Sequence, residues 1–222
     1  MEQKSRRTRG FPQKTKVGGT SVPLSVLLVR HGESEANIHN VIVSDRFDPT
    51  LTDYGRQETQ SLAQKWQGQP VSAIYSSPLR RTMETAQIWA ETLNVATIYP
   101  DPRLHEIHLG AFDGKVIDDI LRTNPEDYNQ WKHNPESPPQ GGEKLSAVGA
   151  RMKAFLDMIA SQYHEGLVIG VTHADCLKAV TLSILEAPWT SAQFLHFGNV
   201  AGVFLEYHDN RFQIHALPVI PI

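Results

Sequence analysis

Two histidines each follow an apolar stretch, and this repeated arrangement is the strongest sign of chemistry in the sequence. The run at 25–29 leads into Arg30 and His31, and the run at 167–171 leads through one threonine into His173. Short continuous apolar runs are typical of buried parallel strands, and ligands of open α/β sheets bind beyond the carboxyl ends of such strands. We therefore expect both imidazoles to meet in one crevice at the edge of a sheet.

Such a crevice suits a phosphate group. Two imidazoles, the Arg30 guanidinium and the amide ends of the helices that follow the strands supply positive charge and hydrogen-bond donors for a tetrahedral dianion. A histidine held by neighbouring donors can also take a phosphoryl group onto a ring nitrogen, which divides one hard transfer into two easier steps. Arginine and imidazolium can spread the charge of a loose transition state, so this chemistry requires no metal.

The elements that must position these residues alternate between strands and helices. Thr52 is a plausible N-cap for a helix to about residue 66, and Pro78 fits the first turn of a helix that starts at 76–78. The pattern further predicts strands over 71–75 and 96–99, helices over 76–93, 143–161 and 174–185, and a closing hairpin over 200–207 and 212–216 that turns at Asp209 and Asn210. We expect residues 23–222 to form one α/β domain: a three-layer α/β/α sandwich with a Rossmann-like, mostly parallel sheet and a C-terminal hairpin.

The stretch from 101 to 142 differs from the rest because Pro and Gly divide it into short pieces. Short helices are predicted over 116–122 and 125–133. Long irregular segments in compact domains are often functional, so we expect this stretch to form a lid or side wall of the crevice.

Composition and charge restrict the function further. The 222 residues carry a formal charge of -3, but the first 20 hold six Lys or Arg and one Glu, so a local +5 leaves -8 for the rest. Residues 1–22 are expected to be a disordered basic tail, and the acidic remainder shows no signature of nucleic-acid binding. Cys176 is the only cysteine, and no apolar run has the length of a membrane span. We expect a cytoplasmic protein with no nucleic-acid or membrane partner; a homodimer is left open.

Several segments resemble one family in order along the chain. Residues 28–37, Leu-Val-Arg-His-Gly-Glu-Ser-Glu-Ala-Asn, resemble the histidine phosphatase superfamily, branch 1, the phosphoglycerate mutase-like proteins. Residues 77–86 are similar to the segment that carries a phosphate-binding arginine, which falls on Arg81, with Arg80 as its solvent-side neighbour. Residues 104–114 are similar to the segment with the general acid, which falls on Glu106. Gly-Gly-Glu at 141–143 and Thr-His at 172–173 match two further motifs, and the resemblance extends from about 25 to 207.

The resemblance implies a role for each matching residue. It implies that His31 attacks phosphorus, that Glu106 protonates the leaving alkoxide and later activates water, and that neither a metal nor a cofactor takes part. The implied phosphate-binding residues are Arg30, Arg81, His173, Asn37 and the backbone amide of Ala174. Asn37 could equally cap a helix. Cys176 is interpreted as a small core residue.

The sequence departs from the family pattern in three ways. Ala174 and Asp175 follow the second histidine in place of the usual glycine, and Thr82 stands where alanine is usual. Gly141 follows Glu106 by only 35 positions, whereas the cofactor-dependent mutases carry a longer insertion. A short wall admits water, so we expect a metal-independent phosphatase acting on a small-molecule phosphomonoester.

Three alternatives remain open from the sequence. The first is a phosphoglycerate mutase, which returns the phosphoryl group to its product. The second is a weakly catalytic, phosphate-binding regulatory module. The third is a hydrolytic metal centre built from His31, His173, Glu106 and Asp175, which the adjacent arginines disfavour because they repel a cation. The alcohol part of the substrate is not identified.

Overall fold

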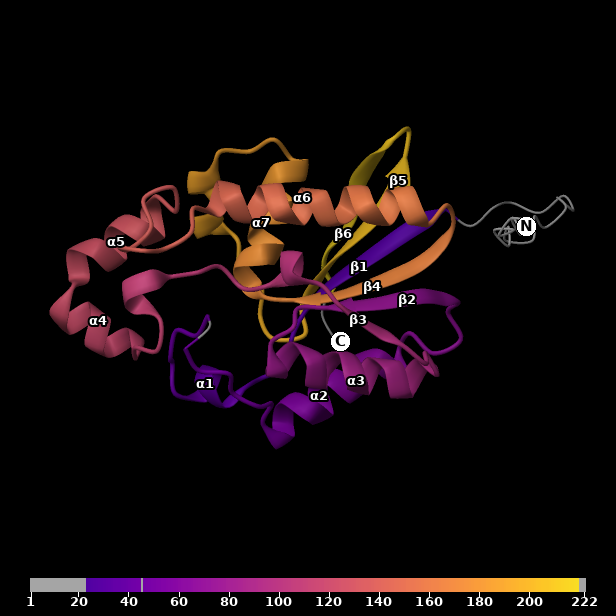
Figure 1. Ribbon diagram of the computed structural model, residues 1–222, viewed down its shortest axis with the longest axis horizontal. Coiled ribbons are helices and arrows are strands. Elements are labelled where there is room, and N and C mark those ends of the chain that lie inside the picture. Colours follow the sequence, from indigo (N-terminus) through magenta and orange to yellow (C-terminus); the bar gives the residue numbers. More distant parts are fainter. Residues whose placement is uncertain (1–22, 45, 220–222) are drawn as a thin grey trace, which may run out of the picture.

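A six-stranded sheet organises the chain, with strand order β3-β2-β4-β1-β5-β6 (Figure 1). The computed structural model describes residues 23–44 and 46–219, and the predicted tail over 1–22 lies outside the described residues. The strands are β1 (Leu24–Arg30), β2 (Val71–Ser76), β3 (Ile98–Pro100), β4 (Gly166–Thr172), β5 (Gly202–His208) and β6 (Arg211–Val219). The first four strands in chain order are mutually parallel, and β5 runs antiparallel to both β1 and β6. The predicted mostly parallel sheet with a C-terminal hairpin is confirmed.

Helices cover both faces of this sheet, as Figure 1 shows, with α2 and α3 on one side and α6 and α7 on the other. The helices are α1 (Glu35–Ile38), α2 (Asp53–Gln64), α3 (Arg80–Leu93), α4 (Ile117–Thr123), α5 (Pro125–His133), α6 (Leu145–Gln162) and α7 (Ala174–Ile184), with short 3-10 turns η1 (Pro102–Leu104), η2 (Gly110–Phe112) and η3 (Trp189–Phe194). The α/β/α layering is therefore as predicted.

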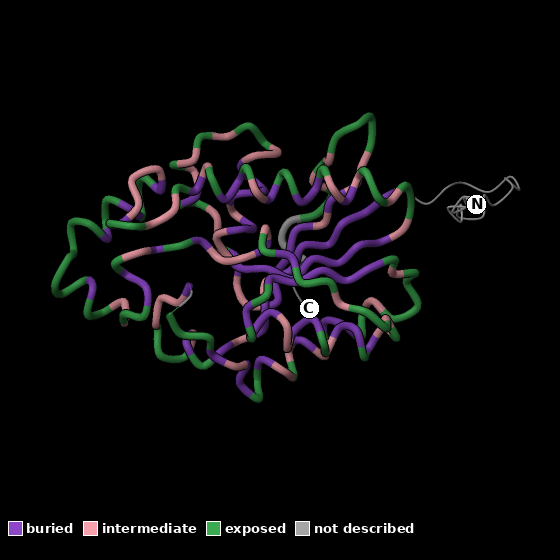
Figure 2. The backbone as a smooth tube through the Cα atoms, viewed as in Figure 1, coloured by how far each residue is buried: buried purple, intermediate pink, exposed green. Residues whose placement is uncertain are grey.

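The core has two halves because the central strands are buried on both faces (Figure 2). Alternate residues of a strand point to opposite faces. Leu28 accordingly belongs to the cluster that includes Phe155 of α6, whereas Leu27 belongs to the cluster that includes Trp89 of α3. This double burial explains why the strands are continuous apolar runs in the sequence.

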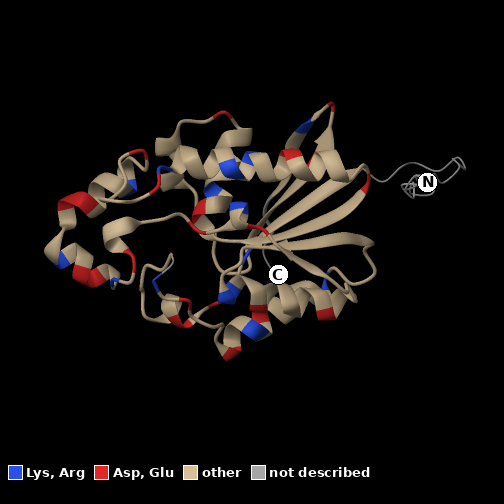
Figure 3. Ribbon diagram, viewed as in Figure 1, with Lys and Arg blue, Asp and Glu red and all other residues tan. Residues whose placement is uncertain are grey.

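The register of β1 and β4 brings the two histidines to the same edge. Arg30 is paired with Thr172, so both strands end level with each other. His31 and His173 are the next residues along the chain, and α1, α4 and α5 project beyond this edge of the sheet (Figure 1). The wall predicted over 101–142 lies there, and its helices α4 and α5 carry acidic residues in their first turns (Figure 3).

Most predicted boundaries hold within a few residues, and the exceptions have local causes. Thr52 caps α2 as predicted, its Oγ1 accepting from Gly55 N at 2.9 Å. Asp209 and Asn210 both have positive φ, as a tight hairpin turn requires. The prediction that β5 starts at residue 200 was wrong, because Val200 has a φ of 51° and its backbone is not extended. Within the described residues, we find no helix with the length and apolarity needed to span a bilayer.

Two helix starts were also predicted too early. Residues 76–79 do not begin α3, because Ser76 belongs to β2 and the Ser77 amide donates to Val171 O at 2.9 Å, which continues the pairing with β4. Glu143 does not begin α6 either. Its backbone amide donates to His108 O at 2.7 Å, which ties residue 143 to the wall, and α6 starts at Leu145.

Candidate active site

His31 lies directly beyond β1, and backbone carbonyl groups fix both its amide and its ring. Its amide donates to Thr172 O at 3.1 Å, and its ring Nδ1 lies 2.7 Å from Gly32 O. A carbonyl oxygen only accepts, so Nδ1 carries the hydrogen and Nε2 keeps its lone pair. Burial, and then the charges of Arg81 and Arg30, lower the pKa of His31 well below its usual range. The ring is therefore neutral near pH 7, with an unprotonated Nε2.

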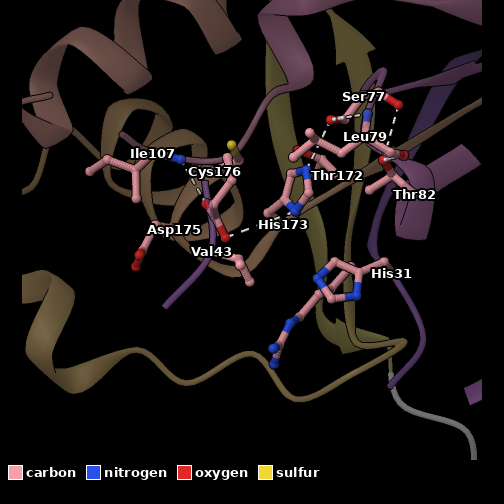
Figure 4. A network of polar contacts seen from close by, with 12 residues as sticks. His31, Val43, Ser77, Leu79, Thr82, Ile107, Thr172, His173, Asp175 and Cys176 are labelled. Carbon is pink, nitrogen blue, oxygen red and sulfur yellow. Dashed lines mark hydrogen bonds and ion pairs between the residues drawn. The ribbon is translucent and has the colours of Figure 1, made fainter. Parts of the chain in front are cut away.

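His173 follows β4 and is fully buried, and Figure 4 shows its contact with Ser77. Its Nδ1 lies 3.2 Å from Arg81 Nη2, and its Nε2 lies 2.9 Å from Ser77 Oγ. A guanidinium only donates, so Nδ1 accepts and Nε2–H donates to Ser77. Burial and the charges of Arg81 and His31 lower the pKa of His173 well below its usual range. The centroids of the His31 and His173 rings are 5.2 Å apart, and the angle between the ring planes is 65°. The two histidines therefore lie together, as predicted.

Arg81 connects the two rings. The side chain is only 2% exposed, and its Nε donates to His31 Nε2 at 3.3 Å while Nη2 faces His173. Nη2 also donates to Val43 O at 3.3 Å. Arg80, its neighbour, is exposed and pairs with Glu84 at 3.1 Å, which confirms that Arg81 is the buried member of the pair.

Two guanidinium groups in the site have buried N–H groups that find no hydrogen-bond acceptor in the part of the chain that the structure describes. Arg30 Nη1 donates to Phe197 O at 2.9 Å, but Arg30 Nε has no hydrogen-bond partner among the described residues. Arg81 Nη1 likewise has none there, with Asp48 Oδ1 3.9 Å away. An unsatisfied buried donor costs roughly 1 to 3 kcal/mol, so both groups favour an anion that would accept from them.

Glu106 supplies a carboxyl group beside this basic cluster. Its Oε1 accepts from Ile107 N at 2.9 Å, and its Oε2 lies 4.0 Å from His173 Nδ1. Burial, and then the negative charge of Asp175, raise the pKa of Glu106 to about 7. A carboxyl group with this pKa is present in both protonation states at neutral pH, as a general acid that later becomes a base requires.

Asn37 and Ala174 complete the predicted set. Asn37 Oδ1 accepts from Ser34 N at 3.0 Å and from Asn199 Nδ2 at 3.1 Å. The carbonyl oxygen therefore caps the start of α1, and the side-chain NH₂ group is available to donate to a ligand. Ala174 is the first residue of α7, where backbone amides have no partner within the helix.

One cavity of about 380 Å³ brings most of these residues together. It is lined by Arg30, His31, Asn37, Arg81, Glu106 and Ala174, together with residues of the wall such as Trp131. His173 does not line this cavity, but it contacts Arg81, which does. Cys176 is buried, and burial raises the pKa of its thiol to about 12, as expected for a core residue.

The surroundings of the histidines do not resemble a metal centre. The Arg81 guanidinium faces a ring nitrogen of each histidine and would repel a cation. Over residues 23–44 and 46–219, no group of three or more His, Cys, Asp or Glu is placed to hold a metal ion.

Sequence reasoning missed two residues of the site. Ser77 Oγ accepts the hydrogen bond from His173 Nε2–H, and its position at the carboxyl end of β2, beside β4, was a usable signal. Asn199 donates both to Asn37 Oδ1 and to His31 O at 3.2 Å. It lies in the loop before β5, where the sequence carries no periodic signal.

Comparison of the sequence with known protein families gives a match. The family model for the histidine phosphatase superfamily (branch 1) matches residues 26–219. Phosphoserine phosphatase 1 of Hydrogenobacter thermophilus is 34% identical over 163 residues, 73% of this chain and 76% of the relative. Phosphoglycerate mutase-like protein 4 of Arabidopsis thaliana is 32% identical over 158 residues, 70% and 68% of the two chains.

Solved structures agree with the sequence relatives. Bacillus stearothermophilus YhfR superposes with a TM-score of 0.82 at 28% identity, covering 87% of this chain and 96% of its own. A mycobacterial glucosyl-3-phosphoglycerate phosphatase in complex with VO3 gives a TM-score of 0.78 at 25% identity, covering 86% and 96%. The matched residues, the sheet and the relatives agree, and the chain belongs to the histidine phosphatase superfamily, branch 1.

Proposed function

We propose that residues 23–222 form a phosphatase domain that hydrolyses a small-molecule phosphomonoester through a phosphohistidine, without a metal. The observation that carries the proposal is the neutral His31, whose unprotonated Nε2 lies 3.3 Å from a buried arginine in a cavity that also holds Glu106. Nucleophile, charge-stabilising groups and proton donor are thus within one site. The free, buried Cys176 is compatible with a reducing compartment, and we include a cytoplasmic location in the proposal.

In the first step, His31 Nε2 forms a bond to phosphorus while the ester P–O bond breaks. The leaving alkoxide takes the proton of the Glu106 carboxyl group. Arg30 and Arg81 donate to the phosphoryl oxygens, including through Arg30 Nε and Arg81 Nη1, which have no other acceptor among the described residues. The Nδ1–H bond to Gly32 O stabilises the positive charge that the phosphorylated ring acquires.

In the second step, water attacks the phosphorus of the phosphohistidine. The Glu106 carboxylate accepts a proton from the water while the P–N bond breaks and the electron pair returns to Nε2. Phosphate leaves, His31 is again neutral, and Glu106 is again protonated. Each group ends in its starting state, so no co-reactant other than water is consumed.

Two observations favour phosphatase over mutase. The wall between Glu106 and Gly141 is short, and a relative and a structural neighbour are both named as phosphatases. Because another relative is named as mutase-like, phosphoglycerate mutase activity remains the alternative. A mutase must protect its phosphohistidine from water, whereas an accessible site favours its hydrolysis.

The decisive experiment detects the intermediate and its fate. The protein is mixed with p-nitrophenyl phosphate, quenched rapidly in alkali and analysed by mass spectrometry for one added phosphoryl group on His31. The wild type and a His208→Ala control, changed on the exposed hairpin, should carry the group, and His31→Ala should not. Normal turnover by His31→Ala would refute the nucleophile assignment, and phosphate binding without turnover in the wild type would favour a regulatory module.

The mutase alternative needs a separate measurement. Incubation with 3-phosphoglycerate should release phosphate, and 2,3-bisphosphoglycerate should not be needed to start the reaction. Formation of 2-phosphoglycerate that depends on the bisphosphate, with little phosphate released, would show that the protein is a mutase.

A further inference from the structure

A second cavity of about 340 Å³ adjoins the catalytic cavity on the side of the wall. Both cavities are lined by Ile107, Trp131, Lys132, Asp175, Lys178 and His196. In Figure 4, Ile107 and Asp175 lie to the left of His173, whereas His31 lies below it and to the right. A phosphomonoester whose phosphorus is at His31 therefore has room for its alcohol part in the second cavity.

The charged residues shared by the two cavities leave one positive charge in excess. Lys178 Nζ contacts Asp175 Oδ1 at 2.8 Å, and both side chains are only 19% exposed. Asp175 raises the pKa of Lys178 above its ordinary value, so this lysine stays charged. Lys132 is the second cation, and Asp175 is the only acidic group among these shared residues.

Lys132 makes no hydrogen bond or ion pair with any described residue. Its Nζ lies instead over two aromatic rings, 4.8 Å from the Trp131 centroid and 5.5 Å from the Tyr128 centroid. These contacts position the ammonium group without supplying an acceptor for its three N–H bonds. A ligand with an anionic oxygen would provide that acceptor.

We infer that Lys132 and Lys178 form a subsite for a carboxylate on the alcohol part of the substrate, so that the substrate class is a phosphorylated hydroxy acid. The inference rests on the proposed phosphatase function and specifies its substrate. One carboxylate balances the one excess charge, whereas a second phosphate would bring about two negative charges. A neutral alcohol would leave Lys132 without an anionic partner. Apolar residues of the second cavity, Leu145 and Leu195, suit the carbon skeleton.

Two pairs of substrates that differ only in the carboxylate provide the test. These are 3-phosphoglycerate against glycerol 3-phosphate, and phosphoserine against phosphoethanolamine. A charge-assisted contact should give the carboxylate-bearing member a roughly 10- to 100-fold higher kcat/KM in at least one pair. Lys132→Met and Lys178→Met should each remove most of this preference, measured as the ratio of kcat/KM for the two members of a pair, so that any general effect on turnover cancels. Lys153→Met, on the outer face of α6 and 66% exposed, is the matched control.

Binding measured without turnover separates this inference from the proposed function. Calorimetry with His31→Ala should show the same preference for 3-phosphoglycerate over glycerol 3-phosphate, and adding Lys132→Glu should reverse it. Equal affinities, or a preference unchanged by the lysine variants, would overturn the subsite while leaving hydrolysis intact. A chain that binds with this preference but never forms phosphohistidine would instead refute the proposed function and keep the subsite.

Discussion

Replacing Glu106 by glutamine removes the proposed general acid and keeps the size of the side chain. Positioned acids contribute roughly 10² to 10⁴ in rate, and they contribute most when the leaving group is a poor one. Glu106→Gln should therefore lower kcat/KM for glycerol 3-phosphate by about 10² to 10⁴ and that for p-nitrophenyl phosphate by less than about tenfold, because nitrophenolate leaves without a proton.

The pH dependence follows from the pKa of about 7 that burial and Asp175 give Glu106. The protonated fraction is about one half at pH 7, about one tenth at pH 8 and about one hundredth at pH 9, and it is this form that donates the proton. Phosphomonoesters are dianions above pH 7, so the ratio of kcat/KM for the two substrates cancels other ionisations. This ratio should fall about tenfold per pH unit above 7 in the wild type and stay flat in Glu106→Gln.

The assay follows phosphate release from both substrates between pH 5 and 9 at constant ionic strength. Glu126→Gln, on the exposed face of α5, is the matched control and should behave like the wild type. A bound dianion disfavours ionisation of Glu106, so the limb in kcat should lie at higher pH than the limb in kcat/KM. Equal losses on both substrates, or a ratio independent of pH in the wild type, would refute the assignment of Glu106 as the acid.

Three further perturbations test other parts of the site. Arg81→Lys should lower kcat/KM by roughly 10² to 10³, since lysine cannot contact both histidines and the phosphate as a planar fork does, whereas Arg80→Lys should change it little; a small effect at Arg81 would exclude a role in charge stabilisation. Gly55→Ala would place its Cβ 2.1 Å from Glu33 O, so denaturant titration should show a loss of about 1 to 3 kcal/mol in unfolding free energy that Gly198→Ala, with open space around its Cβ, does not share. Excess chelator should leave phosphate release unchanged, and activity restored by zinc or magnesium after chelation would revive the metal centre.

The sheet and the meeting of the histidines could be predicted because strand-forming runs carry their own signal. The runs at 26–29 and 167–171, shortly before His31 and His173, contain no polar side chain, since β1 and β4 are buried on both faces. Parallel strands that end level bring the residues after them together. Helix and strand boundaries that depend on distant partners could not be predicted in this way. The start of α3 is one example, because Ser77 still pairs with β4.

The identity of Arg81 and Glu106 as site residues came from family resemblance, because nothing local distinguishes them. Arg80 and Arg81 are adjacent on one helix, and only the packing of α3 against the sheet buries the second of them. Glu106 lies in an irregular segment whose path depends on wall contacts such as that between His108 and Glu143. The second cavity could not be predicted for the same reason. Lys132 and Lys178 are 46 positions apart, and they line one cavity because α5 and α7 both pack against η3.

Arg30 Nε and Arg81 Nη1 have no acceptor over residues 23–44 and 46–219, so phosphate should bind and stabilise the folded chain as well as being its product. The site is assembled from β1, α3, β4 and the segment after η1, which come together only on folding. A ligand that binds the native state alone stabilises it, by about 2.7 kcal/mol at a concentration 100 times its Kd. Thermal stability of this protein should therefore rise with phosphate concentration. Substitutions that supply these guanidinium groups with hydrogen-bond acceptors should raise the melting temperature while weakening catalysis.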